Sequence, residues 1–188
     1  MDNSNEITVK INTQLPSLVE LLLSQGFHLT EKFTLSDVYY IKNDTDLKSD
    51  ILDIIKDCIL IRRHIDDELT KNFLTLKKKL FNKKGEILSQ QKVDLEILSL
   101  DDAKAFLAML GYKELISIDA QIQTYEKGDL GICIQYVNNK YLLVEVEEKG
   151  SLDTVEKLIA ALDEINIDYD KSNYFVKKAQ LIFEENYR

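Results

Sequence analysis

The stretch NEITVKIN, residues 5–12, alternates strictly between polar and apolar side chains. In a β-strand, successive side chains point to opposite faces of the sheet. One face would then carry Glu6, Thr8, Lys10 and Asn12, and the other Ile7, Val9 and Ile11. A strand face that holds both a carboxylate and an ammonium group either looks at water or lines a polar cavity. The rest of the chain has to decide between these alternatives.

The bulk composition is that of an ordinary folded protein with an acidic surface. The 188 residues suffice for a single domain, 1–188, that buries about 70% of the surface of its unfolded chain. A net charge of −9 argues against nucleic-acid and anionic-membrane partners. Cys58 and Cys133 lack a CxxC spacing, which indicates neither a disulfide scaffold nor a zinc site. With neither a signal peptide nor a membrane span expected, we predict a cytoplasmic protein.

Period-2 alternation dominates the chain. Strands are predicted over residues 5–12, 36–42, 57–65, 72–81, 88–98, 113–126, 130–137 and 140–148. Helices are predicted over residues 14–27, 99–112, 151–167 and 171–187, with a short helix or loop insertion over 43–56. Many sequential strands lose their edges most simply by closing on themselves. We therefore predict an α+β fold, an eight-stranded antiparallel β-barrel (tunnel) with flanking helices.

Several further strands separate charged from apolar faces. The charged faces carry Thr75, Lys77 and Lys79, then Gln90, Lys92, Asp94 and Glu96, then Glu145 and Glu147, with Arg62 beside Leu60 and His64. Asp37 is a candidate inward polar group, and Tyr39 a candidate base or ribose contact. Each face alone is most simply a solvated surface. Four amphipathic helices could cover the apolar faces, however, which favours polar faces turned inward around a cavity that holds metal ions and phosphate.

The quoted stretch resembles a known motif. EITVKIN is similar to the N-terminal ExExK strand of the CYTH domain, shared by class IV adenylate cyclases, thiamine triphosphatases and inorganic triphosphatases, also called triphosphate tunnel metalloenzymes. Segments similar to later family motifs follow in order: LSDVYYI, CILIRR, LTLKK, KVDLEI, YEKGDLGICIQYV, LLVEVEE and KSNY. Each motif is short, and their order along the chain makes the set more specific than any one of them.

The resemblance implies that a triphosphate or nucleotide binds with Mg²⁺ or Mn²⁺ in a β-tunnel. It implies a triphosphate phosphohydrolase or a class IV adenylate cyclase-like enzyme; a homodimer is left open. The implied metal ligands are Glu6, Glu96, Glu145 and Glu147, with Asp94 as a further acid. The implied phosphate ligands are Lys10, Arg62, Lys77 and Lys92, and the implied catalytic residues are Glu6, Lys10, Glu145 and Glu147.

The sequence departs from the family pattern at several positions. Thr8 and Gln135 stand where acids are expected, Leu60 stands where a cation is expected, and Asp119, Gln121 and Gln123 stand on a strand that is usually basic. Three absent phosphate contacts at about 1.5–3 kcal/mol each would weaken triphosphate binding by roughly a thousandfold or more. The alternative is a catalytically decayed CYTH-fold protein that binds a phosphorylated or other organic anion without turnover. A purely structural or partner-binding barrel is a third hypothesis.

Overall fold

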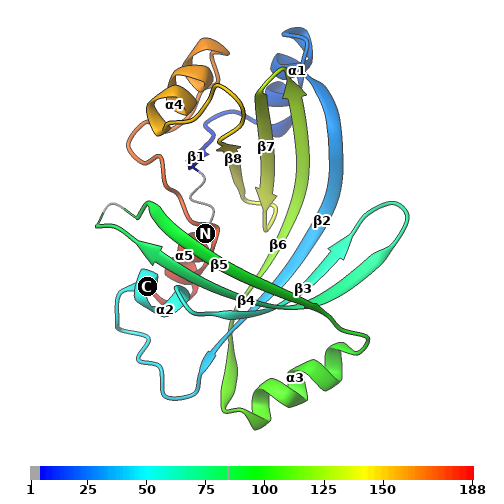
Figure 1. The fold of residues 1–188 in the computed structure, drawn as a ribbon, viewed down its shortest axis with the longest axis vertical. Helices are drawn as coiled ribbons and strands as arrows, with labels where there is room; N and C mark the ends of the chain where they lie inside the picture. Colours follow the sequence, from blue (N-terminus) through cyan, green and yellow to red (C-terminus); the bar gives the residue numbers. More distant parts are fainter. Residues whose placement is uncertain (1–4, 84) are drawn as a thin grey trace. The chain divides into compact units, whose positions relative to one another are not determined.

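A computed structural model describes residues 5–83 and 85–188, apart from the side chains of residues 88–90. Figure 1 shows the strands and helices of this chain. The strands are β1 (Glu6–Lys10), β2 (His28–Lys42), β3 (Ile59–Ile65), β4 (Thr70–Phe81), β5 (Ile87–Glu96), β6 (Tyr112–Lys127), β7 (Leu130–Val137) and β8 (Tyr141–Glu147). The helices are α1 (Leu15–Ser24), α2 (Ile51–Ile55), α3 (Leu100–Met109), α4 (Val155–Glu164) and α5 (Lys178–Tyr187).

The eight strands form one sheet in the order β1-β8-β7-β6-β2-β3-β4-β5. The pairs β1·β8, β7·β8, β6·β7, β2·β3, β3·β4 and β4·β5 are antiparallel. An antiparallel sheet with separate helices confirms the predicted α+β class. The sheet is not closed, so the barrel is not confirmed.

The described chain forms two compact units. Unit 1 consists of residues 34–119 and 177–188, and unit 2 of residues 5–33 and 120–176. The long strands β2 and β6 contribute residues to both units.

In unit 2, helices α1 and α4 pack on the apolar face of the strands. Pro16 lies in the first turn of α1, where its missing N–H costs nothing, and Gly26 supplies a left-handed residue, at φ +84°, just after the helix. The cluster contains Ile7, Val9 and Ile11 of β1, Ile132 and Ile134 of β7, Val144 and Val146 of β8, Leu18 and Leu22 of α1, and Leu158 and Leu162 of α4. The polar residues of β1 and β8 therefore lie on the side away from this core, as the alternation predicts.

The second edge of β1 is also paired, which explains why β1 does not continue the sheet. The N–H of Thr8 donates to the carbonyl of Tyr174 at 2.9 Å, and the carbonyl of Thr8 accepts from Val176 at 3.0 Å. Further along, the carbonyl of Lys10 accepts from the N–H of Asp170 at 2.8 Å. Because β8 occupies the first edge, β1 has no unpaired edge here with which to close a barrel.

In unit 1, helix α3 packs on the apolar face of β2, β3 and β4. Ser99 caps this helix by accepting from the N–H of Asp102, which satisfies one of its unpaired N–H groups. Leu107 and Ala103 are buried against Tyr40 and Ile61. The predicted division of these strands into a covered apolar face and an opposite polar face is thus confirmed.

The starts of two elements differ clearly from the sequence prediction. β2 begins at His28 instead of residue 36, and α5 begins at Lys178 instead of residue 171. The seven residues before α5 include those that pair with β1, which keeps them extended instead of helical. The region 43–56 contains the short helix α2, capped by Asp50. None of the helices in the described part of the chain is long and apolar enough to cross a bilayer.

Candidate functional site

The polar face of unit 1 is an ordered ladder of side chains across four strands. Residues directly opposite each other in antiparallel strands share a face. One row runs through Asp37, Arg62, Phe73 and Glu96; the next runs through Tyr39, Leu60, Thr75 and Asp94; and a third pairs Lys77 with Lys92. The register thus brings Arg62, Lys77 and Lys92, predicted as phosphate ligands, to one face of β3, β4 and β5.

Asp37 and Arg62 form a buried, two-pronged ion pair on this face. Arg62 donates from Nε to Oδ1 at 2.7 Å and from Nη2 to Oδ2 at 2.6 Å. The side chains are 1% and 14% exposed for Asp37 and Arg62 respectively. Burial acts to raise the pKa of Asp37, but the guanidinium outweighs it and lowers that pKa. These two bonds use the N–H of Nε and one N–H of Nη2, and the guanidinium has three further N–H groups, two on Nη1 and one on Nη2.

Lys77 lies in a strongly cationic environment. Its burial, followed by the positive charges of Arg62, Lys79 and Lys178, lowers the pKa of Lys77 to about 7, while Asp37 acts in the opposite direction. A bound anion near these four cations would relieve their mutual repulsion and favour the charged form of Lys77. This is the clearest electrostatic signal for a phosphate or carboxylate ligand in unit 1.

Lys92 forms an ion pair with a residue of its own strand, β5. Its Nζ lies 2.6 Å from Oδ2 of Asp94, and Oδ1 of Asp94 accepts from the hydroxyl of Thr75 at 2.6 Å. Burial acts to raise the pKa of Asp94, but Lys92 and Thr75 outweigh it and lower that pKa. The side chains of Lys92 and Asp94 are 40% and 34% exposed, so water screens this ion pair. Lys92 could therefore exchange Asp94 for a phosphate at little cost.

Unit 2 carries the acids of the first and last strands. Glu6 lies directly opposite Glu147, and Thr8 lies opposite Glu145. Partial burial, followed by the charge of Glu6, raises the pKa of Glu147. Nε2 of Gln135 donates to Glu145 at 3.0 Å. A divalent cation between the two facing carboxylates would stabilise the ionised form of Glu147.

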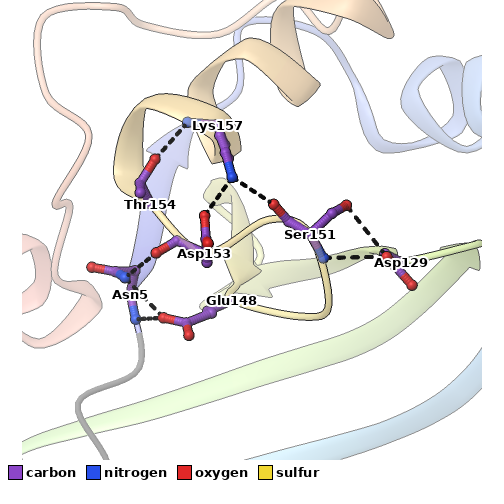
Figure 2. Close-up of polar contacts among 7 residues, drawn as sticks. All are labelled: Asn5, Asp129, Glu148, Ser151, Asp153, Thr154 and Lys157. Atoms are coloured by element: carbon purple, nitrogen blue, oxygen red, sulfur yellow. Dashed lines mark hydrogen bonds and ion pairs between the residues drawn. The ribbon is translucent and has the colours of Figure 1, made fainter.

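A set of polar contacts holds the chain around Glu6 and Glu147 (Figure 2). Asn5 donates from its backbone N–H and from Nδ2 to Glu148 at 2.9 and 2.8 Å, which joins the residues directly before Glu6 and after Glu147. Asn5 also donates to the carbonyl of Asp153 at 2.7 Å. Figure 2 also shows Lys157 of α4 reaching Asp153 at 2.6 Å. These contacts hold the ends of β1 and β8 next to each other and support the Glu6–Glu147 register.

Lys10 shares the face of Glu6 and Thr8 but lies at its exposed end. It is opposite Leu143, and its ammonium group lies 5.8 Å from the centre of the Tyr141 ring. Thr8 and Gln135, which replace the expected acids, are buried at 5% and 6% exposure. This part of the polar face is therefore less acidic than the family pattern implies.

Gln121 and Gln123, which stand on the strand that is usually basic in the family, do not face the candidate site. These residues lie opposite Tyr136 and Ile134 of β7, on the face that packs against α1 and α4. The β6 residues that share a face with Gln135 and Cys133 are Ile122 and Thr124. Ala120 lies on the same face, two residues before Ile122 along β6. On the candidate-site side, the unit 2 part of β6 thus offers no charged group between Ala120 and Thr124.

The predicted metal ligands are divided between the two units. Glu6, Glu145 and Glu147 belong to unit 2, whereas Glu96 is an exposed residue of unit 1. Within the described ranges, no group of three or more His, Cys, Asp or Glu side chains is placed to hold a metal ion. The Glu6–Glu147 pair, with Glu145 one step along the same face, fits a divalent ion in charge and in oxygen chemistry.

Tyr39 and Lys178 have other roles in the structure than the sequence analysis expects. Tyr39 was a candidate base, but burial raises the pKa of its hydroxyl further above its ordinary value, so it stays protonated. Lys178, which the sequence analysis placed inside a packing helix, instead opens α5 and acts electrostatically on Lys77 and Asp37. In the sequence, the start of α5 at Lys178 could have been recognised from the Lys177–Lys178 doublet. This doublet directly precedes the apolar pattern of Ala179, Ile182 and Phe183.

The fold is shared with solved structures that span nearly the whole chain. The PH1819 protein of Pyrococcus horikoshii matches with a TM-score of 0.72 and 20% identity over 97% of this chain and 99% of that one. Two proteins described as putative adenylate cyclases also match. The Vibrio parahaemolyticus protein has a TM-score of 0.65 at 12% identity, over 97% of this chain and 98% of that one. The Bacillus halodurans protein has a TM-score of 0.54 at 14% identity, over 97% and 100%.

No protein-family model matches this sequence, and no curated protein matches it. The structural likeness confirms the CYTH-like fold that the sequence motifs imply.

Proposed function

We propose that this protein binds a triphosphate or nucleotide together with Mg²⁺ or Mn²⁺ and hydrolyses the triphosphate. The observation that carries the proposal is the cationic environment of Lys77 on the polar face of unit 1. Three cations, Arg62, Lys79 and Lys178, act on Lys77 there, and the carboxylate of Asp37 already accepts from two nitrogens of Arg62. A polyphosphate supplies several negative charges in a short chain, which is what such a face attracts.

The metal part of the proposal rests on unit 2. Glu6 and Glu147 face each other, and the pKa of Glu147 is raised by partial burial and by Glu6. A divalent ion held by these carboxylates would neutralise phosphate charge and orient phosphate oxygens. The side chains of Arg62, Lys77 and Lys92 would bind the phosphate groups and stabilise charge on the leaving phosphate.

A second candidate function is anion binding without turnover. Buried Thr8 and Gln135 replace carboxylates, and the β6 face beside Gln135 presents Ala120, Ile122 and Thr124. Fewer acids leave fewer groups to hold a second metal ion or to activate water. The cationic face of unit 1 serves this function equally well.

One experiment separates these functions. The pure protein is incubated with tripolyphosphate, ATP or thiamine triphosphate, each with Mg²⁺ or Mn²⁺, and phosphate, pyrophosphate and cyclic AMP are assayed. Binding is measured in parallel by calorimetry. Turnover lost in both Lys77→Met and Glu147→Gln supports the enzyme. Saturable binding without turnover supports the second function, and neither binding nor turnover contradicts both.

Each variant has a control that makes the same chemical change away from the candidate site. Lys78 follows Lys77 on β4 but points to the opposite face and is exposed, so Lys78→Met removes the same charge away from the candidate site. Glu20 is an exposed residue of α1, and Glu20→Gln is the control for Glu147→Gln. Both control variants should keep the parent's binding and turnover.

A further inference from the structure

Strand β5 lies at one end of the sheet and has an exposed outer edge. At the other end of the strand order, β1 pairs with β8 on one side and with residues 174–176 on the other. Among the described residues, β5 has a backbone partner on one side alone, which is β4. The six consecutive residues 91–96 of β5 are all exposed. Such an edge offers a row of N–H and C=O groups to another strand.

The register shows which backbone groups of β5 point away from the sheet. The N–H of Ile97 donates to the carbonyl of Asn72 at 2.9 Å, which continues the β4·β5 ladder by one residue. Hydrogen-bonded and non-hydrogen-bonded residue pairs alternate along an antiparallel ladder, so Leu95 and Val93 also bond to β4. The residues between them have N–H and C=O groups that point away from β4: Lys92, Asp94 and Glu96.

The side chains of β5 add a charged pair on one face and an apolar patch on the other. Lys92 and Asp94 lie on the polar face and form the ion pair of 2.6 Å. Val93 and Leu95 lie on the opposite face and are 54% and 58% exposed. Leu76 of β4, directly opposite Val93, is 38% exposed. These three side chains form an exposed apolar patch that reaches the free edge.

This edge is complementary to itself. Two copies related by a two-fold axis would pair β5 with β5 in the antiparallel sense. The axis has to pass through a residue, because an axis between two residues would set outward-pointing backbone groups against inward-pointing ones. With the axis at Val93, Lys92 of each copy lies opposite Asp94 of the other. An axis at Lys92 or Asp94 would set that charge against its own copy, and an axis at Leu95 would set Asp94 against Glu96.

We propose that β5 is an interface at which a second copy of this chain binds, with the two β5 strands paired antiparallel about Val93. This register joins two pairs of opposite charges on the polar face. On the other face it places Val93 against Val93 of the second copy and extends the apolar patch across the axis. The inference does not depend on the proposed function, because it concerns the sheet edge and not the bound ligand.

A cysteine at the axis tests the register. In a non-hydrogen-bonded antiparallel pair the two Cα atoms lie about 4.5 Å apart, within the range of a disulfide. Val93→Cys should therefore give a disulfide-linked dimer on mild oxidation, seen by non-reducing gel electrophoresis. Gln91→Cys is the matched control, because Gln91 is exposed on the same face but would lie roughly 13 Å from its counterpart. Neither Gln91→Cys nor the parent should cross-link.

Exchanging the charges tests the same register without a cross-link. A single pair of short strands makes a small interface, so we expect a dimer Kd of roughly 1–100 μM in analytical ultracentrifugation. Lys92→Glu sets like charges against each other at two symmetric places and should weaken this Kd about 10- to 100-fold. The double variant Lys92→Glu/Asp94→Lys should dimerise again, because opposite charges face each other once more. Lys104→Glu, the same change at an exposed lysine of α3, should dimerise as the parent does.

The outcomes decide the inference. Circular dichroism checks that each variant is folded, and the cross-linking test stands if Lys92→Glu is not. A parent protein that is monomeric throughout this concentration range overturns the inference. So does a dimer whose Kd is the same in folded Lys92→Glu, or one that cross-links through Gln91→Cys and not through Val93→Cys. Cross-linking of Val93→Cys alone, with dimerisation lost in Lys92→Glu and regained in the double variant, supports it.

Discussion

Arg62 donates hydrogen bonds to both carboxylate oxygens of Asp37 on the neighbouring strand, at 2.7 and 2.6 Å, and Asp37 is almost completely buried. The two residues are direct partners in the β2·β3 register, so the strands themselves hold the guanidinium in place. The pair therefore fixes the orientation of Arg62 on the polar face, whichever anion binds there. It also makes each residue dependent on the other, because either charge alone would be buried without a partner.

Asp37→Asn should be strongly destabilising. The amide keeps the shape of the side chain but leaves the Arg62 charge, 14% exposed, without its counter-ion. Breaking a buried pair in this way costs about 3–5 kcal/mol in the free energy of unfolding, which urea denaturation measures. The double variant Asp37→Asn/Arg62→Met should recover much of the loss, since no unpaired charge remains. A double variant as unstable as the single one would contradict this account.

The Asp37–Arg62 pair should also sensitise the protein to acid. The pKa of Asp37 is lower in the folded chain than its ordinary value of 3.8. The pair's contribution is therefore fully present above about pH 4 and is lost as the pH falls through the folded-state pKa. Urea denaturation at several pH values should show a steeper loss of stability in acid for the parent than for the double variant. Equal acid profiles would contradict a paired Asp37.

Lys77 should give the opposite kind of pH dependence. Its pKa is about 7 in the folded chain and 10.5 in the reference state, so between these values the unfolded chain holds one more proton. The free energy of unfolding should therefore rise with pH across this window, on the order of 5 kcal/mol in total. In Lys77→Met this rise should disappear, and the variant should be more stable than the parent at pH 7. A parent protein without this rise would show that Lys77 is solvated.

The alternation of side chains was enough to predict much of the fold. It identified the polar and apolar faces of β1, β3, β4, β5 and β8, and Pro16 and Gly26 marked the ends of α1. These signals are local, because period-2 patterning and helix termini depend on neighbouring residues.

The parts that the sequence did not reveal depend on long-range contacts. Thr8 bonds to Tyr174 and Val176 through backbone groups, which leave no side-chain pattern to read. On β6, the alternation placed Gln121 and Ile122 on opposite faces but could not say which face looked toward the site. The register places Ile122, not Gln121, beside Gln135. Lys178 was missed because its neighbours on β2 and β4 lie more than a hundred residues away in the chain.

Mg²⁺ should stabilise the protein through Glu147. The pKa of Glu147 is raised by partial burial and by Glu6, so its ionised form is disfavoured and stability should fall as the pH rises through that pKa. A bound divalent ion removes this penalty. At ten times its Kd, Mg²⁺ should stabilise the parent by about 1.4 kcal/mol, or roughly 3–5 °C in Tm. Glu147→Gln should respond less, while Glu20→Gln responds as the parent does; equal responses in all three proteins would contradict a metal site at Glu147.

The loop that follows β8 offers a comparison between two glycines with the same backbone conformation. Gly150 and Gly128 have φ of +57° and +59°, where any other L-residue costs about 1–2 kcal/mol. A Cβ at Gly128 meets no atom within 4 Å, whereas a Cβ at Gly150 would overlap Oδ2 of Asp129. That oxygen accepts from the N–H and the hydroxyl of Ser151, both at 3.3 Å, so moving it disrupts two contacts (Figure 2).

Gly150→Ala should therefore destabilise the protein more than Gly128→Ala, by about 1 kcal/mol in urea denaturation. The two variants share the left-handed strain, so their difference measures the displacement of Asp129. In an Asp129→Ala background this difference should vanish, because no carboxylate remains to be displaced. Because residues 148–154 hold the end of β8 beside Asn5, Gly150→Ala should also reduce the stabilisation by Mg²⁺. Equal unfolding free energies for the two glycine variants in the parent background would show that the Asp129 contact contributes nothing to the loop.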